Sequence, residues 1–329
     1  MMAASAAFVY LRDPFQVLRR SSGTPNFYGV AQFQIPGIAR HYPYDAVVAG
    51  TSTSNNFRAA DLADQFGWHA FNFSIAGATI GEQRAVLETA LATGKARHVL
   101  WGIDPFAFGR DEGGAFPYYL YRDPGWRTAP YFLNLGALIH GVSTLTLPGA
   151  RRTSLARWTE DAVWDRNYVY GRVQLLTAWD HRHALAPVPM PETPALADGA
   201  VTRTVASLAR AHPDVEFRIV LMPYNVLYLK FLLEERPGEF DAGCWIDRAI
   251  VARVAVLPNA RVHDFRDARE ITHNIDAFKD LTHFSGEISR QIIHEVAADR
   301  RQATPEAFDH ACTLIKADAA AYQVRAGRE

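Results

Sequence analysis

Short apolar runs alternate with amphipathic stretches along most of the chain. The runs predict buried strands at 44–50, 69–75, 97–103, 216–222 and 261–265. Apolar runs without polar alternation are typical of strands that are covered on both faces of a sheet. The stretches between them place apolar residues on one helical face and predict helices at 55–66, 81–92, 195–211, 226–235, 245–257, 285–299 and 304–322.

Strands that alternate with helices at this spacing indicate a parallel sheet with helices on both faces. The predicted fold class is therefore α/β, a three-layer α/β/α sandwich with a five-stranded parallel sheet of the flavodoxin-like type. An aromatic-rich stretch interrupts the pattern, with helical pieces near 131–140 and 154–164. We expect one domain over 44–329 with a lid-like helical insertion at about 105–194, preceded by an N-terminal segment at 1–43.

The charge balance narrows the classes of partner. The 329 residues include 34 Lys and Arg against 35 Asp and Glu, with no polybasic run. This balance argues against nucleic acid and favours an uncharged sugar or a small ester. A nucleotide-binding domain is disfavoured, because neither GxxxxGK[ST] nor GxGxxG follows the first strand.

The N-terminal residues 1–11 are apolar but shorter than the roughly 20 residues that span a bilayer. They also lack the positive start and cleavage signature of a secretory signal. Two interpretations stay open: an ordinary apolar segment, or the end of a membrane anchor.

Few residues suggest metal or disulfide chemistry. Cys244 and Cys312 are too few for a disulfide framework, and two buried free thiols are expected, with one disulfide in an oxidising compartment as the alternative. His181 and His183 lack nearby carboxylates in the sequence and indicate a surface pair. We expect no cofactor and no metal.

Polar residues follow the predicted first strand, in the loop Gly50-Thr51-Ser52-Thr53-Ser54. Active sites of open parallel sheets lie beyond the carboxyl ends of the strands. Taken alone, this loop favours Ser52 or Ser54 as a helix cap, since Ser is a preferred capping residue. A nucleophilic serine needs partners from elsewhere.

Two further loops offer such partners. Gly77 follows the second strand, where glycine lets the backbone approach a substrate closely. Asp280-Leu281-Thr282-His283 precedes the last amphipathic segments. An activated serine needs an imidazole to accept its proton and a carboxylate to hold that imidazole, and this loop supplies both.

Gly-x-Ser, the later glycine and D-x-x-H, in this order, resemble the SGNH (GDSL-like) hydrolase superfamily. The resemblance covers about 44–104 and 216–300. It implies that Ser52 is the nucleophile and that Asp280 and His283 complete a triad. It also implies that the N–H groups of Ser52 and Gly77 form an oxyanion hole.

One block departs from the family pattern. The family has Gly-x-Asn with the Asn as another oxyanion donor, and Asp104 stands at that position. An ionised carboxylate accepts hydrogen bonds and repels an oxyanion. Either Asp104 is turned away or protonated, or another group such as Asn55 or Asn56 donates.

Other motifs narrow the resemblance. Asp13-Pro14-Phe15, the GTSTS serine block and the ending Lys279-Asp280…His283-Phe284 are similar to extracytoplasmic, membrane-tethered members of the superfamily. These act in polysaccharide O-acetylation or D-alanyl transfer. The resemblance implies a periplasmic or cell-surface location and favours the anchor interpretation of residues 1–11.

We therefore predict a serine-dependent acyl esterase or acyltransferase of O-acetyl type that acts on a cell-envelope or exopolysaccharide carbohydrate. Its partners would be a carbohydrate polymer or acyl donor, and a membrane acyltransferase or a polysaccharide export complex. The alternative is a catalytically inactive polysaccharide-binding or assembly protein. Most insertion aromatics are expected to form the insertion's own core, with one or two in contact with ligand.

Overall fold

A computed structural model describes residues 2–21, 31–109, 116–122, 128–146 and 168–324. Within it, five strands form one parallel sheet in the order β2-β1-β3-β4-β5. The strands are β1 Ala46–Ala49, β2 Ala70–Asn72, β3 His98–Ile103, β4 Glu216–Leu221 and β5 Ala260–Asp264. The predicted five-stranded parallel sheet and its strand positions are confirmed.

The strands alternate their side chains between two apolar layers. Val47, Val99 and Ile219 belong to one core cluster, whereas Val48, Leu100 and Val220 belong to the other. Successive side chains of a strand point to opposite faces, so continuous apolar runs supply both layers at once. The predicted three-layer sandwich is confirmed.

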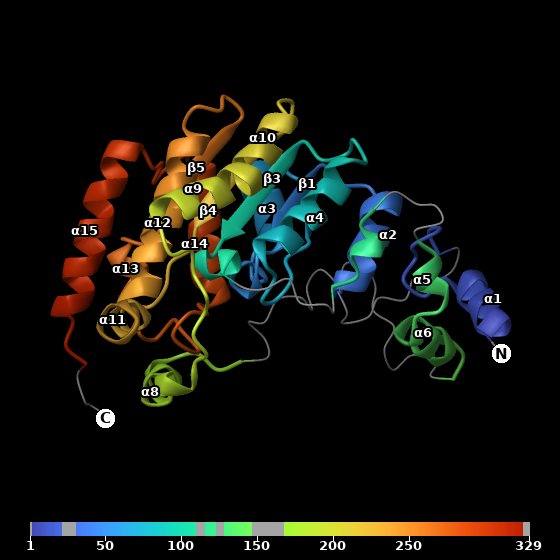
Figure 1. Cartoon of the computed structure of the whole chain (residues 1–329), viewed down its shortest axis with the longest axis horizontal. Helices are drawn as coiled ribbons and strands as arrows, with labels where there is room; N and C mark the ends of the chain where they lie inside the picture. The colour runs from blue at the N-terminus through green and yellow to red at the C-terminus, as the bar shows by residue number, and fades with distance from the viewer. Residues whose placement is uncertain (1, 22–30, 110–115, 123–127, 147–167, 325–329) are drawn as a thin grey trace.

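Helices cover both faces of the sheet (Figure 1). The first face is packed by α4 Ile80–Leu91, α9 Pro194–Val201, α10 Ser207–Ala211 and α12 Pro237–Val254. The second is packed by α3 Ala59–Phe66, α13 Arg269–Thr272 and α14 Gly286–Ala297. The last helix, α15 Pro305–Ala321, contacts α12 and α11 Val226–Glu235.

Several predicted helix bounds were wrong. The stretch 55–66 is helical only from Ala59 onward, in α3, because Asn55 ends the preceding 3-10 turn at Ser52–Ser54 and Arg58 is extended before the helix begins. The stretch 195–211 contains a π-helical turn at Thr202–Ala206 between α9 and α10. Helix α12 begins at Pro237, earlier than the predicted residue 245, because proline is well suited to the first turn of a helix.

The insertion after β3 lies partly within the described residues. It contains the 3-10 turns Pro105–Phe108, Tyr118–Leu120 and Arg182–Ala184, and the helices α5 Ala129–Phe132, α6 Leu135–Thr146 and α8 Arg172–Asp180. The single helix predicted at 131–140 is thus divided between α5 and α6, because the Asn134 side chain accepts from Ala137 N and starts a new helix there. The helix predicted at 154–164 lies outside the described residues.

The N-terminal residues form α1 Met2–Arg12 and α2 Ala31–His41, and α1 packs on α5 and α6. Asp13 ends α1 and accepts hydrogen bonds from the backbone N–H groups of Val17, Leu18 and Arg19 and from Tyr131 Oη. No helix among the described residues is long and apolar enough to cross a membrane.

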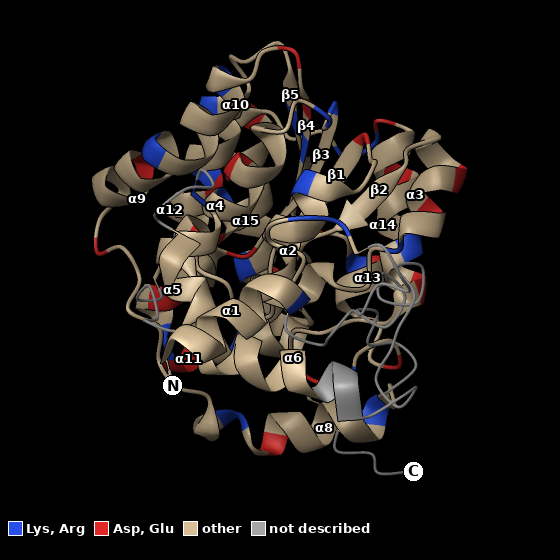
Figure 2. Ribbon diagram, turned by 90° about the vertical axis from the view of Figure 1, so that its right-hand side faces the viewer, with Lys and Arg blue, Asp and Glu red and all other residues tan. Residues whose placement is uncertain are grey.

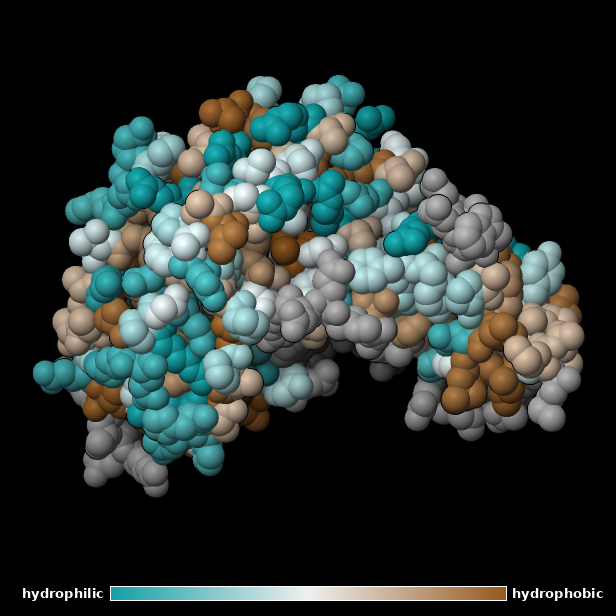
Figure 3. Space-filling view, in the orientation of Figure 1, coloured by the Kyte–Doolittle hydropathy of each residue, from teal (hydrophilic) through white to brown (hydrophobic). Residues whose placement is uncertain are grey.

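Charged and apolar residues are distributed unevenly over the surface. Lys and Arg are interspersed with Asp and Glu over the sandwich, whereas α1 and α6 are nearly free of charge (Figure 2). Apolar residues gather on the part of the molecule formed by α1, α5 and α6 (Figure 3). The exposed members are Tyr10, Leu11, Leu133, Leu135, Ile139 and Val142.

Candidate active site

The site lies where the strand order reverses. The chain runs from β1 outward to β2 and then crosses to β3 on the other side of β1. A crevice opens at such a switch point, beyond the carboxyl ends of the two central strands. The loop of Ser52 leaves β1 and the loop of Asp104 leaves β3, so the two meet at this crevice.

Ser52 begins a single 3-10 turn directly after β1. Neither Ser52 nor Ser54 caps a helix, so the capping interpretation was wrong: Thr51 Oγ1 accepts from Thr53 N at 3.5 Å, and α3 has no side-chain cap. The Ser54 side chain fits against Gly50 and Gly102, where an added Cβ would overlap its hydroxyl. Gly50 also has φ +150°, which disfavours other residues.

The Asp280-x-x-His283 loop is a tight turn organised by its own carboxylate. Asp280 Oδ1 accepts from Thr282 N at 2.9 Å and from His283 N at 2.8 Å. Lys279 N donates to His283 O at 3.0 Å and closes the loop. Asp side chains favour such turns because they bond the backbone two residues ahead.

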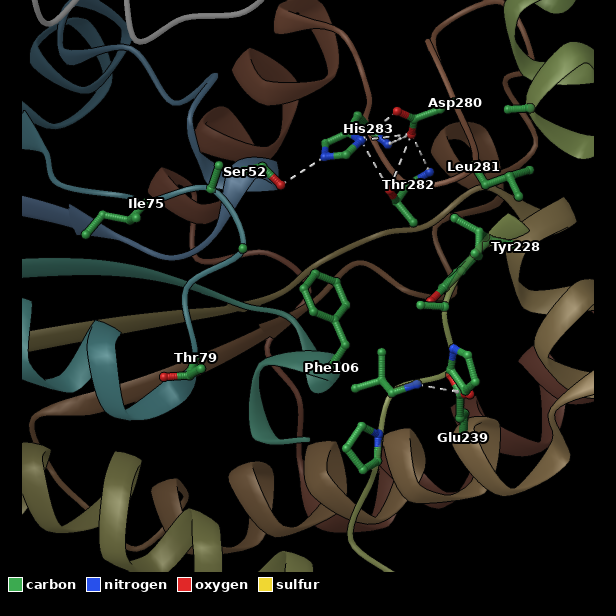
Figure 4. A pocket seen from close by; sticks show the side chains of 18 of the residues that line it. Ser52, Ile75, Thr79, Phe106, Tyr228, Glu239, Asp280, Leu281, Thr282 and His283 are labelled. Atoms are coloured by element: carbon green, nitrogen blue, oxygen red, sulfur yellow. Dashed lines mark hydrogen bonds and ion pairs between the residues drawn. The ribbon is translucent and has the colours of Figure 1, made fainter. Parts of the chain in front are cut away.

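The two loops bring the predicted side chains together (Figure 4). Ser52 Oγ lies 2.9 Å from His283 Nε2, and His283 Nδ1 lies 2.7 Å from Asp280 Oδ2. An ionised carboxylate only accepts, so His283 carries its proton on Nδ1 and leaves Nε2 to accept from the serine hydroxyl. The arrangement can deprotonate Ser52 when it attacks an electrophile.

Asp280 stays ionised because its partners outweigh its burial. Burial by itself raises the pKa of Asp280, but hydrogen bonds from His283 and Thr282 and the charge of Lys279 hold that pKa below its usual value. Lys279 Nζ lies 3.1 Å from Asp280 Oδ2 and also over the ring of Tyr168. The carboxylate is therefore charged at neutral pH.

Asp104 is turned away from the cavity, one of the alternatives that its departure from the family pattern left open, and so is not placed as an oxyanion donor. Its side chain is 0% exposed and accepts from the hydroxyls of Thr51, Thr53 at 2.8 Å and Tyr224 at 2.6 Å. Burial raises its pKa, and the hydroxyl donors oppose that rise. Thr51 and Thr53 flank Ser52, so Asp104 fixes the serine loop from beneath.

The other candidate donors have different positions. Gly77, with φ +71°, lines the same cavity as Ser52 and His283. Asn56 Nδ2 donates to Phe284 O at 3.1 Å and so ties the serine loop to the histidine loop. Asn55 follows the 3-10 turn, and its backbone N–H donates to Ser52 O at 3.2 Å.

Sequence reasoning missed several supporting residues. Asn72, at the end of β2, donates to Ser54 O at 2.8 Å and to Phe57 O at 2.9 Å. Tyr224, after β4, completes the set around Asp104. Their position directly after a strand was the available signal, because strand ends of a parallel sheet meet at one edge.

A cavity of about 1000 Å³ opens over Ser52 and His283. The insertion supplies one wall through residues 185–189, whose backbone is held by Arg236 and Glu239. Among the insertion aromatics, Phe106 and Phe116 line this cavity, whereas Tyr131 is buried in the core. Trp126, Trp158 and Trp164 lie outside the described residues.

The two histidines and two cysteines considered in the sequence analysis take no part in the triad. His181 lines the cavity and His183 pairs with Glu235 at 2.9 Å, both with exposed side chains. Within the described part of the chain, no group of three His, Cys, Asp or Glu residues is placed to hold a metal. Cys244 on α12 and Cys312 on α15 are free thiols with their sulfurs 2.7 Å apart, and they are half-buried rather than buried as predicted.

Comparison with known proteins gives only distant similarity. No protein-family model and no curated protein matches the sequence. A solved structure from Streptococcus pneumonia, provisionally described as a platelet activating factor, is 11% identical with a TM-score of 0.42, over 82% of this chain and 89% of its own. An alpha/beta hydrolase enzyme from the metagenome of Lake Arreo, Spain, is 12% identical with a TM-score of 0.38, over 79% and 97%. The site is therefore interpreted from its own geometry.

Proposed function

We propose that this protein is a serine-dependent acyl hydrolase of the SGNH type that removes a short acyl group from a carbohydrate. One observation carries the proposal: Ser52, His283 and Asp280 form a continuous hydrogen-bonded relay at a cavity of about 1000 Å³. The same relay would serve transfer to a sugar hydroxyl if such an acceptor replaced water.

The relay accounts for each proton. His283 Nε2 takes the Ser52 proton as Oγ bonds to the acyl carbon, and the backbone N–H groups of Ser52 and Gly77 stabilise the oxyanion. The C–O bond to the sugar breaks as His283 returns that proton to the sugar oxygen. Water then attacks the acyl-serine by the reverse proton path and releases the carboxylic acid.

The proposed substrate class rests on the volume of the cavity over Ser52 and on the aromatic and charged residues in its walls. A cavity of about 1000 Å³ with Phe106, Phe116, Arg236 and Glu239 in its walls is large enough for more than one sugar ring. Aromatic faces and a mixed pair of charges suit a neutral carbohydrate better than a polyanion. The apolar surface of α1 and α6 supports the further proposal of a membrane-proximal, extracytoplasmic protein.

A fluorophosphonate probe tests the proposal directly, because it labels only a serine that a neighbouring base activates. We expect wild type to be labelled and Ser52→Ala to be unlabelled. Ser54→Ala is the matched control, since Ser54 lies on the same turn, is 0% exposed and has no hydrogen bond to His283. It should be labelled like wild type.

The alternative of an inactive polysaccharide-binding protein predicts a different result. Wild type would then remain unlabelled, or Ser52→Ala would be labelled to the same extent as wild type. A sugar acceptor added to the ester assay separates hydrolysis from transfer: an O-acylated sugar forms only if the acceptor competes with water.

A further inference from the structure

A second, smaller cavity lies beside the cavity of Ser52. Its volume is about 60 Å³, and Phe106, Tyr228 and Glu239 line both cavities. The two spaces therefore lie on either side of the same side chains. In the view of Figure 4 the Phe106 ring stands between the Ser52–His283 pair and Glu239.

The small cavity is connected to the serine loop through the chain itself. Pro105 and Phe106 line it and directly follow Asp104, the residue that holds Thr51 and Thr53. Tyr224, which donates to Asp104, also lines it. The same residues thus fix Ser52 and shape the small cavity.

The sides of this cavity are apolar. Met190, Leu229, Leu232, Phe240 and Ile315 line it, from the insertion and from α11, α12 and α15. A narrow apolar space is poorly hydrated and favours hydrocarbon over water. A sugar hydroxyl would lose its hydrogen bonds there.

One part of the cavity wall is polar. Asp247 is 2% exposed and Arg266 is 7% exposed, and Arg266 Nη1 donates to Asp247 Oδ2 at 3.0 Å. A hydrocarbon chain that reached these two side chains would lie against buried polar atoms, which is unfavourable. At roughly 10–15 Å³ for each water-sized group, the volume of about 60 Å³ admits about four to six heavy atoms.

We infer that this cavity receives the alkyl chain of the ester that Ser52 attacks, and that it selects short acyl groups, whose alkyl chains have no more than about four to six carbons. The inference rests on the proposed function and names the acyl half of its substrate. The carbonyl carbon lies at Ser52, the alkyl chain passes Phe106 and Tyr228, and the carbohydrate occupies the larger cavity.

Gly243 allows the cavity to be filled from one side. It lies on α12 and lines the cavity, and a Cβ added to it would meet Pro105 at 3.7 Å, an ordinary contact. A larger side chain therefore fits at the wall and takes up the space beyond it. Gly238 lies on the same helix with nothing within 4 Å of an added Cβ, so Gly238→Leu is the matched control.

The experiment compares p-nitrophenyl acetate, butyrate and octanoate as substrates of the full chain. Wild type is expected to hydrolyse acetate and butyrate with similar kcat/KM and octanoate at least tenfold more slowly. Gly243→Leu is expected to lower kcat/KM for butyrate at least tenfold and for acetate less than threefold. Gly238→Leu should match wild type on all three esters.

A second variant guards against misfolding. Gly243→Ala adds one methyl group, and we expect it to lower the butyrate-to-acetate ratio of kcat/KM two- to threefold with an unchanged melting temperature. An unchanged ratio in both Gly243 variants, or equal wild-type rates on octanoate and butyrate, would overturn the inference. A wild type that no fluorophosphonate labels would overturn the proposed function and this inference together.

Discussion

Two loops bring a carboxylate close to Ser52, and their environments give the two groups different properties. Asp280 lies at the cavity beside Lys279 and His283, and its pKa is held low by hydrogen bonds and charge despite burial. Asp104 is fully buried among hydroxyl groups, and burial raises its pKa.

The difference teaches that position at a sheet edge does not by itself assign a role. A carboxylate that touches an imidazole and a cation can stabilise charge that develops on that imidazole. A carboxylate surrounded by neutral hydroxyls holds those hydroxyls in place and so fixes the conformation of the loop that carries them. The comparison predicts that changes at Asp280 alter chemistry and that changes at Asp104 alter both folding and geometry.

The largest effect is expected at Asp280. Asp280→Asn removes the acceptor that fixes the tautomer of His283, and kcat/KM for p-nitrophenyl acetate should fall by about 10⁴. The free energy of unfolding should change little, because the loop keeps an amide oxygen as acceptor. Asp276→Asn is the control, because it changes an exposed carboxylate in the same loop. A fall in kcat/KM of less than tenfold in Asp280→Asn would contradict the catalytic role assigned to Asp280.

Asp104→Ala should have a smaller effect on rate and a larger effect on stability. Thr51, Thr53 and Tyr224 lose their shared acceptor, and the free energy of unfolding should fall by about 3 kcal/mol in urea titrations. The shifted Ser52 loop should lower kcat/KM by about 10². Asp104→Asn keeps a carbonyl acceptor and should lie between Ala and wild type; an Ala variant as stable as wild type would contradict the structural role.

Asp247 extends the comparison to a third buried carboxylate. Arg266 gives two hydrogen bonds to Asp264, at 2.8 and 2.5 Å, and one to Asp247. Asp247 Oδ1 has no hydrogen-bond partner among the described residues, and burial raises the pKa of Asp247 to about 8. Its stabilising contribution is therefore full below its unfolded pKa, near 4, and is lost as pH rises toward 8.

Asp247→Asn should remove the loss of stability that wild type shows as pH rises toward 8, because an amide does not ionise. The melting temperature of the variant relative to wild type should rise by about 3 °C between pH 5 and pH 8. Differential scanning fluorimetry across this range checks the sign. A difference that falls with pH would mean that Arg266 keeps Asp247 ionised.

The smallest effect is expected at Lys279. Lys279→Met removes one of several groups that lower the pKa of Asp280, and kcat/KM at neutral pH should fall about threefold. A depressed pKa contributes stability that is present at neutral pH and lost as pH falls through the folded pKa. The melting-temperature difference between wild type and variant should therefore shrink below about pH 4; a constant difference would show that Lys279 acts through packing on Tyr168.

Much of the sheet and of the relay could be predicted from local pattern. The five apolar runs became strands because each supplies side chains to both layers, a requirement written in consecutive residues. Ser52, Asp280 and His283 could be paired because the order of their motifs along the chain resembles the SGNH hydrolase superfamily. The environment of Asp104 could not, because its partners come from the loops after β1 and β4.

The sequence by itself therefore determined the order of strands and helices and the chemistry available at Ser52. Tertiary structure alone decided that Asp104 is buried beneath the serine loop and that Gly243 lines a small apolar cavity. The reason is physical: periodicity and turn chemistry act over a few residues, whereas burial, cavity shape and the pKa of a carboxylate depend on side chains that only the folded chain brings together.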